Sequence, residues 1–119
     1  MNPVDQKQRE IIPTATTPFE PYDEYGEVLE GLTWLKLNYD AATVRGYYLL
    51  RFAPGGRCLP HVHSAIEEFM VLEGDLEDND GTVFKTGDFV RFYPGTEHYS
   101  VAPRGCLLLV VLNGKNQVI

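Results

Sequence analysis

The three histidines of this chain occur together with one glutamate in two short blocks of sequence. The first block contains His61-x-His63-x3-Glu67, and the second block ends at His98. Three neutral imidazoles and one carboxylate are a suitable ligand set for one divalent transition metal ion. The sequence therefore predicts a metal site with His61, His63, Glu67 and His98 as its ligands.

The spacing of these residues suits β-strands. Residues two apart on a strand point to the same face, so His61 and His63 would enter one space. A tight turn after His63 can bring the next strand back antiparallel. The inward side of that strand would then carry Glu67, Phe69 and Val71. A distant strand must supply His98, and the Pro-Gly turn before it would direct its side chain inward.

Each of these residues also has an ordinary explanation when it is taken alone. Glu67 would be a surface carboxylate, and His98 a core histidine with satisfied hydrogen bonds. Together they favour a metal, because a carboxylate that enters a small apolar barrel without a partner costs several kcal/mol or stays protonated. A metal present at about 1,000 times its dissociation constant would instead add about 4 kcal/mol of stability.

Short strands separated by Gly and Pro turns make up the chain from about residue 27 onward. We expect strands at residues 32–38, 44–53, 58–63, 67–73, 83–85, 89–92, 99–102 and 106–112. The run Asp-Asn-Asp-Gly at 78–81 predicts a hairpin turn, because these residues tolerate positive φ. No amphipathic helix longer than two turns is visible. The pattern predicts an all-β sandwich or barrel in a single domain, residues 27–119.

The first 26 residues differ in character from the rest of the chain. Four prolines interrupt any helix there, and no alternating pattern appears; they are Pro3, Pro13, Pro18 and Pro21. We expect an extended arm at residues 1–26 that lies over the body or over a partner subunit. We expect its first ten residues to be disordered.

Bulk composition narrows the possible partners. The 119 residues carry a net charge of −7, which argues against nucleic acid or an anionic membrane as the main partner. No apolar run is long enough to span a membrane, and the N-terminus lacks the apolar region of a secretory signal. The two cysteines, Cys58 and Cys106, form no CxxC pair, which favours a reducing cytoplasm.

The two blocks resemble the paired motifs of the cupin superfamily, and the resemblance covers residues 45–112. Residues 55–74 fit the first motif, G-x5-H-x-H-x3,4-E-x6-G, throughout. In the second motif, G-x5-P-x-G-x2-H-x3-N, both glycines and His98 fit, whereas Pro94 sits one place late and Ala102 replaces the asparagine. The resemblance implies a jelly-roll β-barrel, usually dimeric. The ligands it implies are His61, His63, Glu67 and His98.

A narrower resemblance concerns residues 72–111. This stretch is similar to the cupin domain of ChrR-type anti-sigma factors and to small cupins grouped with the acetylacetone-cleaving dioxygenase. ChrR-type proteins bind the sigma factor through a separate zinc-binding helical domain. This chain has no spare His or Cys ligands for such a domain, so the resemblance does not imply an anti-sigma role. The dioxygenase uses three histidines, so Glu67 would be an additional ligand or a base.

The ligand set and the resemblance together imply a non-heme metal-dependent oxygenase for a small oxygen-chelating compound such as a β-dicarbonyl. Iron is the favoured metal, with zinc, nickel or manganese as alternatives. Glu67 would act as the base if it can detach. The apolar wall of the pocket would be Phe69, Val71, Val90 and Phe92. Polar candidates for orienting a substrate are Tyr47, Arg51, Tyr99, Arg91 and Tyr93.

Two other functions stay open. A cupin can hold a metal and a small ligand without turnover, as a sensor or regulatory module. It can also be a structural barrel whose task is dimerisation. We expect a homodimer in each case, because an exposed strand edge needs covering.

Overall fold

The computed structural model describes all of residues 1–119, and nearly all its regular structure is β-strand. The only helix is a 3-10 turn, η1 (Gln6–Gln8). The longer strands are β2 (Leu32–Asp40), β3 (Arg45–Phe52), β6 (Glu67–Asp78), β8 (Phe89–Phe92) and β11 (Cys106–Asn113). The shorter ones are β1 (Glu20–Pro21), β4 (Gly56–Arg57), β5 (His61–His63), β7 (Val83–Lys85), β9 (Glu97–His98), β10 (Ser100–Ala102) and β12 (Asn116–Val118). The prediction of an all-β chain is confirmed.

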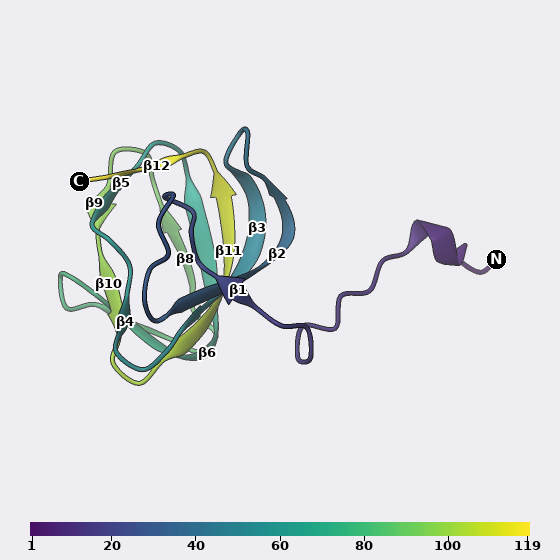
Figure 1. Ribbon diagram of the computed structural model, residues 1–119, viewed down its shortest axis with the longest axis horizontal. Helices are drawn as coiled ribbons and strands as arrows, with labels where there is room; N and C mark the ends of the chain where they lie inside the picture. The colour runs from purple at the N-terminus through teal and green to yellow at the C-terminus, as the bar shows by residue number, and fades with distance from the viewer.

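The strands pair antiparallel in two sheets that curl around one interior (Figure 1). The larger sheet has nine strands in the order β1-β2-β3-β11-β6-β10-β4, and β7 and β8 also pair with β6. The smaller sheet has three strands in the order β12-β5-β9. Two predicted metal ligands lie on β5 and one on β9, so this small sheet carries most of the expected site.

Alternation along the strands decides which side chains enter the interior. On β3, Tyr48, Leu50 and Phe52 are buried and Arg51 is exposed, whereas Leu49 is buried although it lies on the other face of the strand. Tyr48 pairs with Val110 on β11, and Val110 pairs with Phe69 on β6, so these three side chains form one inward row across three strands. Burial of such side chains, at roughly 25 cal/mol per Å² of apolar surface, is the main force that closes the barrel.

The hairpin between β6 and β7 forms where the sequence predicts it. Asp78 accepts a backbone hydrogen bond from Gly81 and donates one to Thr82, and Gly81 has a φ of +89°. β6 is longer than expected, since it runs through to Asp78 instead of ending near residue 73. The hairpin therefore begins at Asp78, a residue that also takes part in the candidate site.

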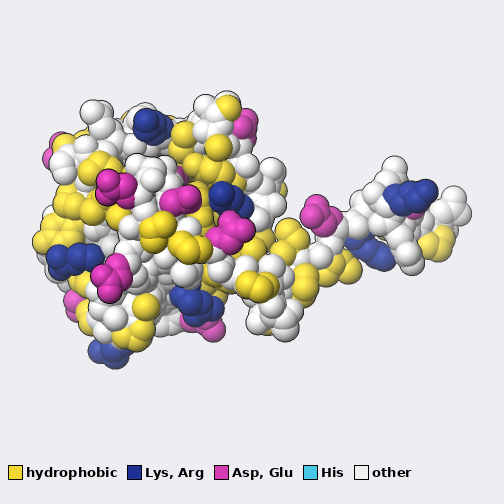
Figure 2. Space-filling view, in the orientation of Figure 1, with side chains coloured by type: hydrophobic (Ala, Val, Ile, Leu, Met, Phe, Trp, Pro, Cys, Tyr) yellow, Lys and Arg dark blue, Asp and Glu magenta, His cyan; other side chains and the backbone are white.

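The N-terminal arm is shorter than predicted. Residues 1–19 extend away from the body (Figures 1 and 2) and lengthen the molecule to 51 Å against 29 and 28 Å in the other directions. Residues 20–26, expected in the arm, belong instead to the barrel, because β1 pairs with β2 and Tyr22 is buried against Trp34. The arm also projects from the body and does not lie over it. The chain has no helix long and apolar enough to cross a membrane.

Candidate metal centre

The four predicted metal ligands come from three strands and meet inside the barrel. His61 and His63 lie on β5, Glu67 begins β6, and His98 lies on β9 directly opposite His61 in the strand register. All four side chains are buried, and their ligand atoms lie within 4.8 Å of one another. Consistent with this burial, Figure 2 shows no histidine on the face it displays. The group could hold one metal ion.

The outer nitrogen of each histidine has a hydrogen-bond partner of its own. His61 Nδ1 lies 2.6 Å from the carbonyl oxygen of Leu59, and His98 Nδ1 lies 2.7 Å from Asp78 Oδ1. Both partners accept hydrogen bonds, so each of these rings donates from Nδ1. The hydrogen on Nδ1 leaves Nε2 of each neutral ring as a lone pair that faces the interior.

Thr96 fixes the third ring in the same way. His63 Nδ1 lies 2.9 Å from Thr96 Oγ1, and the threonine hydroxyl donates its own hydrogen, over 2.7 Å, to the carbonyl oxygen of Tyr93. The hydroxyl oxygen must therefore accept from His63 Nδ1–H. All three rings thus direct an unprotonated Nε2 toward one point.

This convergence leaves acceptor atoms facing one another. His61 Nε2 lies 3.2 Å from His63 Nε2, and His63 Nε2 lies 2.9 Å from Glu67 Oε2. His98 Nε2 is buried without any hydrogen-bond partner. Acceptor atoms at these distances, one of them on a carboxylate, repel unless a proton or a metal cation lies between them, and the donor set fits a divalent transition metal ion.

Glu67 is held at both of its carboxylate oxygens. Oε2 faces His63, and Oε1 accepts a hydrogen bond of 3.0 Å from the side-chain amide of Asn116 on β12. Burial by itself raises the pKa of this carboxyl, but without a metal the hydrogen bond and charge of protonated His63, the charge of His61 and the hydrogen bond from the Asn116 amide outweigh it and lower the pKa overall. The carboxylate is therefore ionised, as a metal ligand must be.

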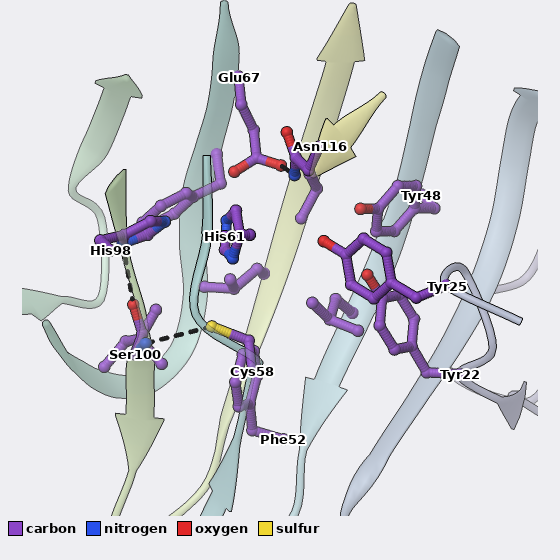
Figure 3. A pocket seen from close by; sticks show the side chains of 15 residues that line it. Tyr22, Tyr25, Tyr48, Phe52, Cys58, His61, Glu67, His98, Ser100 and Asn116 are labelled. Carbon is purple, nitrogen blue, oxygen red and sulfur yellow. Dashed lines mark hydrogen bonds between the residues drawn. The ribbon is translucent and has the colours of Figure 1, made fainter. Parts of the chain in front are cut away.

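A cavity opens beside the metal centre on the side of β3 and β11 (Figure 3). The cavity has a volume of about 40 Å³, which is space for roughly three waters. Its apolar wall consists of Leu50, Phe52, Phe69, Leu76, Leu108 and Val110. Its other lining residues are Tyr22, Tyr25, Tyr48, Cys58, His61, Glu67, His98, Ser100 and Asn116.

The predicted apolar wall lies in the interior, but only one of its members borders the cavity. Phe69 lines it. Phe92 stacks on His63 with ring centroids 5.0 Å apart and lies 4.2 Å from the His98 ring, so it packs behind the histidines. Val71 is buried, and Val90 packs on the hydrophobic core without bordering the cavity.

The predicted polar residues face outward, which differs from the expectation that they contact a ligand in the barrel. Tyr48 points inward on β3. Tyr47 and Arg51 lie an odd number of residues away from Tyr48, so both point outward. Tyr47 is 43% exposed, and Arg51 lies 3.6 Å from Glu73 on the surface. Tyr99 is exposed for the same reason, since it lies between two inward residues.

Arg91 and Tyr93 also lie outside the cavity. Arg91 pairs with Glu68 across β8 and β6 at 2.7 Å, and Tyr93 is exposed in the turn that precedes His98. Tyr93 still contributes its backbone carbonyl, which orders the Thr96 hydroxyl behind His63. Of the five polar candidates, Tyr93 is the one that helps to orient a metal ligand, through its backbone carbonyl.

Several residues of the site were not predicted from the sequence. Tyr48 could have been found from the alternation that places Leu50 and Phe52 inward. Asp78 and Asn116 carry no local signal, because their roles arise from pairing with distant strands. Cys58, expected on a strand, lies just after β4 and lines the cavity; burial raises the pKa of its thiol to about 11, so the thiol stays protonated.

Comparisons with known structures show the fold. The crystal structure of an acetylacetone dioxygenase from Acinetobacter johnsonii superposes with a TM-score of 0.78 at 17% identity, over 100% of this chain and 85% of that one. An RmlC-like cupin from Shewanella frigidimarina gives 0.69 at 22% identity, over 91% and 93%. ChrR, in the Rhodobacter sphaeroides complex of SigE with this anti-sigma factor, gives 0.59 at 26% identity, over 69% of this chain and 44% of that one.

A search among curated proteins finds no match. The structural neighbours confirm the cupin jelly roll that the two sequence blocks imply. The family model described as the ChrR cupin-like domain matches residues 7–116. With nearly the whole chain matched, this protein belongs to the family of ChrR cupin-like domains.

Proposed function

We propose that this protein holds one divalent transition metal ion, iron in the first instance, and acts as a non-heme oxygenase on a small oxygen-chelating compound such as a β-dicarbonyl. The observation that carries the proposal is the convergence of three unprotonated Nε2 atoms and one carboxylate beside a small, mostly apolar cavity. Zinc, nickel and manganese are the alternative metals for such a donor set.

The residues of the chain have distinct tasks in this proposal. His61, His63 and His98 hold the ion, and their Nδ1 partners keep the rings oriented. The bound ion would supply Lewis acidity that favours the enolate form of a chelating ligand, together with open positions for that ligand and dioxygen. The apolar wall excludes water, and the small size of the cavity limits the ligand to a small molecule.

Glu67 serves better as a ligand than as a mobile base. Both of its carboxylate oxygens are engaged, one toward His63 and one by Asn116. Detachment would leave the Asn116 amide without its acceptor in a buried place, which costs about 1–3 kcal/mol. This supports a ligand set of three histidines and one glutamate.

The structural neighbours include an acetylacetone dioxygenase and a second protein that is described as a putative one. Both superpose over the full length of this chain. Their identities of 17% and 12% establish the shared fold, and the activity enters here as part of the proposal. The cytoplasm is the compartment we propose, because Cys58 and Cys106 are both free thiols.

A second candidate is a sensor that binds a metal and a small ligand without turnover. The family description supports it, because the matched model is named for the cupin domain of an anti-sigma factor. A sensor would keep the same ligands and cavity but would need no dioxygen position.

The decisive experiment is metal analysis followed by oxygen uptake. The iron(II)-loaded protein is mixed with acetylacetone in an oxygen electrode, with His61→Ala and His98→Ala as metal-free variants and Tyr47→Phe as an outward-facing control. We expect uptake in the parent and the control, and loss of most of the metal in both histidine variants. Ligand binding without uptake would favour the sensor, and full metal content in the histidine variants would refute the site.

A further inference from the structure

Glu24 is a largely buried carboxyl that lies between two hollows of the barrel. Tyr22, which lines the inner cavity, donates a hydrogen bond of 2.6 Å from its hydroxyl to Glu24 Oε2. The other oxygen, Oε1, is buried without a hydrogen-bond partner. Glu24 itself lines a groove on the outside of the barrel, together with Asp23, Trp34, Lys36, Tyr39, Ala41, Ala42, Val44 and Lys115. The Tyr22–Glu24 pair therefore joins the inner cavity to the outer groove.

Three tyrosines form the wall of the cavity that faces the metal centre (Figure 3). The ring centroid of Tyr22 lies 6.2 Å from that of Tyr25 and 6.5 Å from that of Tyr48. Figure 3 shows the hydroxyls of Tyr25 and Tyr48 directed into the cavity on the side of Asn116. A tyrosine hydroxyl can donate and accept at once, so Tyr22 can accept a proton on its oxygen while it passes its own proton to Glu24.

The proposed reaction needs a proton acceptor that the metal centre does not provide. A β-dicarbonyl must lose a proton to bind as its enolate. Glu67 is engaged at both oxygens, and the three histidines direct their lone pairs at the metal position. The Cys58 thiol lines the cavity but is already protonated. Ser100 also lines the cavity, but its hydroxyl donates to Asp78 Oδ1, which already accepts from His98. The tyrosine wall is therefore the polar route that leads to a carboxyl outside the metal centre.

We propose that Glu24, acting through Tyr22, accepts the proton that a β-dicarbonyl gives up when it binds in the cavity as its enolate. This inference rests on the proposed function. The enol O–H bond breaks, its electron pair stays on the ligand oxygen, and its proton goes to the Tyr22 hydroxyl oxygen. The proton already on that hydroxyl moves to Glu24 Oε2, and no oxidant or reductant takes part. From Glu24 the proton leaves through the outer groove.

The surroundings of Glu24 suit this task at neutral pH. Burial raises the pKa of Glu24 to about 7, the Tyr22 hydrogen bond opposes the rise, and the negative charge of Glu67 adds to it. The other titratable or charged groups near it are Asp23, Tyr25, Lys36, Tyr39, Tyr48 and Lys115. A base with a pKa near the working pH is the most effective in proton transfer.

The test follows enolate formation without oxygen, so that it does not depend on turnover. Iron(II)-loaded protein is mixed with acetylacetone under anaerobic conditions, and the enolate absorbance is recorded by stopped flow across the pH range. In the parent protein we expect the rate to rise as Glu24 ionises near pH 7. Glu24→Gln should lower the rate by about 100-fold and remove that rise, while metal content stays unchanged.

Two further variants separate proton transfer from a structural role. Tyr22→Phe keeps the ring and breaks the relay, so its rate should fall as in Glu24→Gln. Glu24→Asp should restore part of the rate together with its pH dependence. Glu27→Gln, an exposed carboxylate in the same segment, should behave as the parent. Infrared titration should show one carboxyl that ionises near pH 7 in the parent and is missing from Glu24→Gln.

The outcomes distinguish this proposal from the proposed function. Enolate formation in the parent with an unchanged rate and pH profile in Glu24→Gln would overturn the role of Glu24 alone. An infrared titration that places the Glu24 pKa near its ordinary value would do the same. No enolate in the metal-loaded parent would overturn both the proposed function and this inference.

Discussion

Single hydrogen bonds decide how the histidine rings of the metal centre are held. The Asp78 carboxylate orients His98, the Thr96 hydroxyl orients His63, and the Leu59 carbonyl orients His61. Asp78 Oδ1 also accepts a hydrogen bond of 3.1 Å from the Ser100 hydroxyl. Such partners fix the tautomer of a ligating imidazole and strengthen it as a donor, so residues that never touch the ion affect its affinity.

Asp78→Asn should lower metal affinity by about 10- to 100-fold. The amide can donate to His98 Nδ1, which favours the tautomer with its hydrogen on Nε2 and removes the lone pair from the metal position. Competition with a chromophoric chelator measures the effect. Asp80→Asn, two residues away in the exposed turn, is the matched control, and equal affinities in the two variants would contradict the role given to Asp78.

Glu24 also predicts how stability depends on pH. Burial raises the pKa of Glu24 in the folded protein to about 7, above the ordinary glutamate value of 4.5, so the protonated form favours folding. Its contribution is complete below pH 4.5 and is lost as pH rises through 7. A shift of this size corresponds to about 3–4 kcal/mol as an upper bound. Urea unfolding at pH 5 and pH 8 should show a smaller loss of stability for Glu24→Gln than for the parent; equal losses would speak against the shift.

At the scale of the elements, a close backbone approach at Gly74 of β6 helps to fix the register of the strand that carries Glu67. Gly74, the last glycine of the first sequence block, lies on β6 opposite Cys106 with a φ of +74°. A Cβ atom there would meet the carbonyl oxygen of Gly105 at 2.3 Å, so the close approach of β6 and β11 requires glycine. This contact holds β6 in place between Glu67 at one end and Asp78 at the other.

Gly74→Ala should therefore destabilise the protein by about 1–3 kcal/mol or more. Gly81→Ala is the matched control, because Gly81 has a similar positive φ but open space around its Cα. Its cost should be limited to the backbone conformation, about 1–2 kcal/mol. Equilibrium unfolding in urea compares the two, and an equal loss would mean that the contact with Gly105 is unimportant.

Elements with a strong local pattern were predictable from the sequence, and those that depend on a distant partner were not. The alternation of β3, the hairpin at residues 78–81 and the His-x-His spacing are local signals. The two-residue strands β1, β4 and β9 exist only because a partner strand lies alongside. Tyr47 and Tyr48 are adjacent and alike, so only the alternation with Leu50 and Phe52 tells them apart, and the pairing of Tyr48 with Val110 shows that Tyr48 points inward.

At the scale of the whole molecule, the outer face of the large sheet is unusually apolar. One row of side chains crosses five strands on this face, namely Leu35, Leu49, Leu109, Met70 and Phe89. Phe89 is 56% exposed and Met70 37%, whereas Leu35 and Leu109 are half-buried and Leu49 is buried. Exposed apolar side chains that continue such a row are typical of protein–protein contacts. The arm, residues 1–19, starts beside this face, since Phe19 lies 5.4 Å from the Arg51 guanidinium.

We expect the protein to form a homodimer through this face. Met70→Lys combined with Phe89→Lys should place like charges at the centre of the contact and give a monomer, with metal content unchanged. Sedimentation velocity at micromolar concentration checks this, with Val83→Lys as an exposed control on β7. A parent that sediments as a monomer, or a double variant that stays dimeric, would contradict the prediction.

The tyrosine wall has a consequence for the speed of exchange. Tyr22 and Tyr25 lie on a segment that is tied to the barrel by the two-residue ladder of β1 with β2 and by two backbone hydrogen bonds of Tyr22, with Leu29 and Leu32. A segment with so few cross-strand bonds opens at a lower free energy than the core strands. We therefore expect the residence time of a metal or ligand to follow the opening of residues 20–26 rather than unfolding of the barrel. The time that a metal or ligand stays bound would then be set by residues 20–26, the part of the barrel nearest the projecting arm.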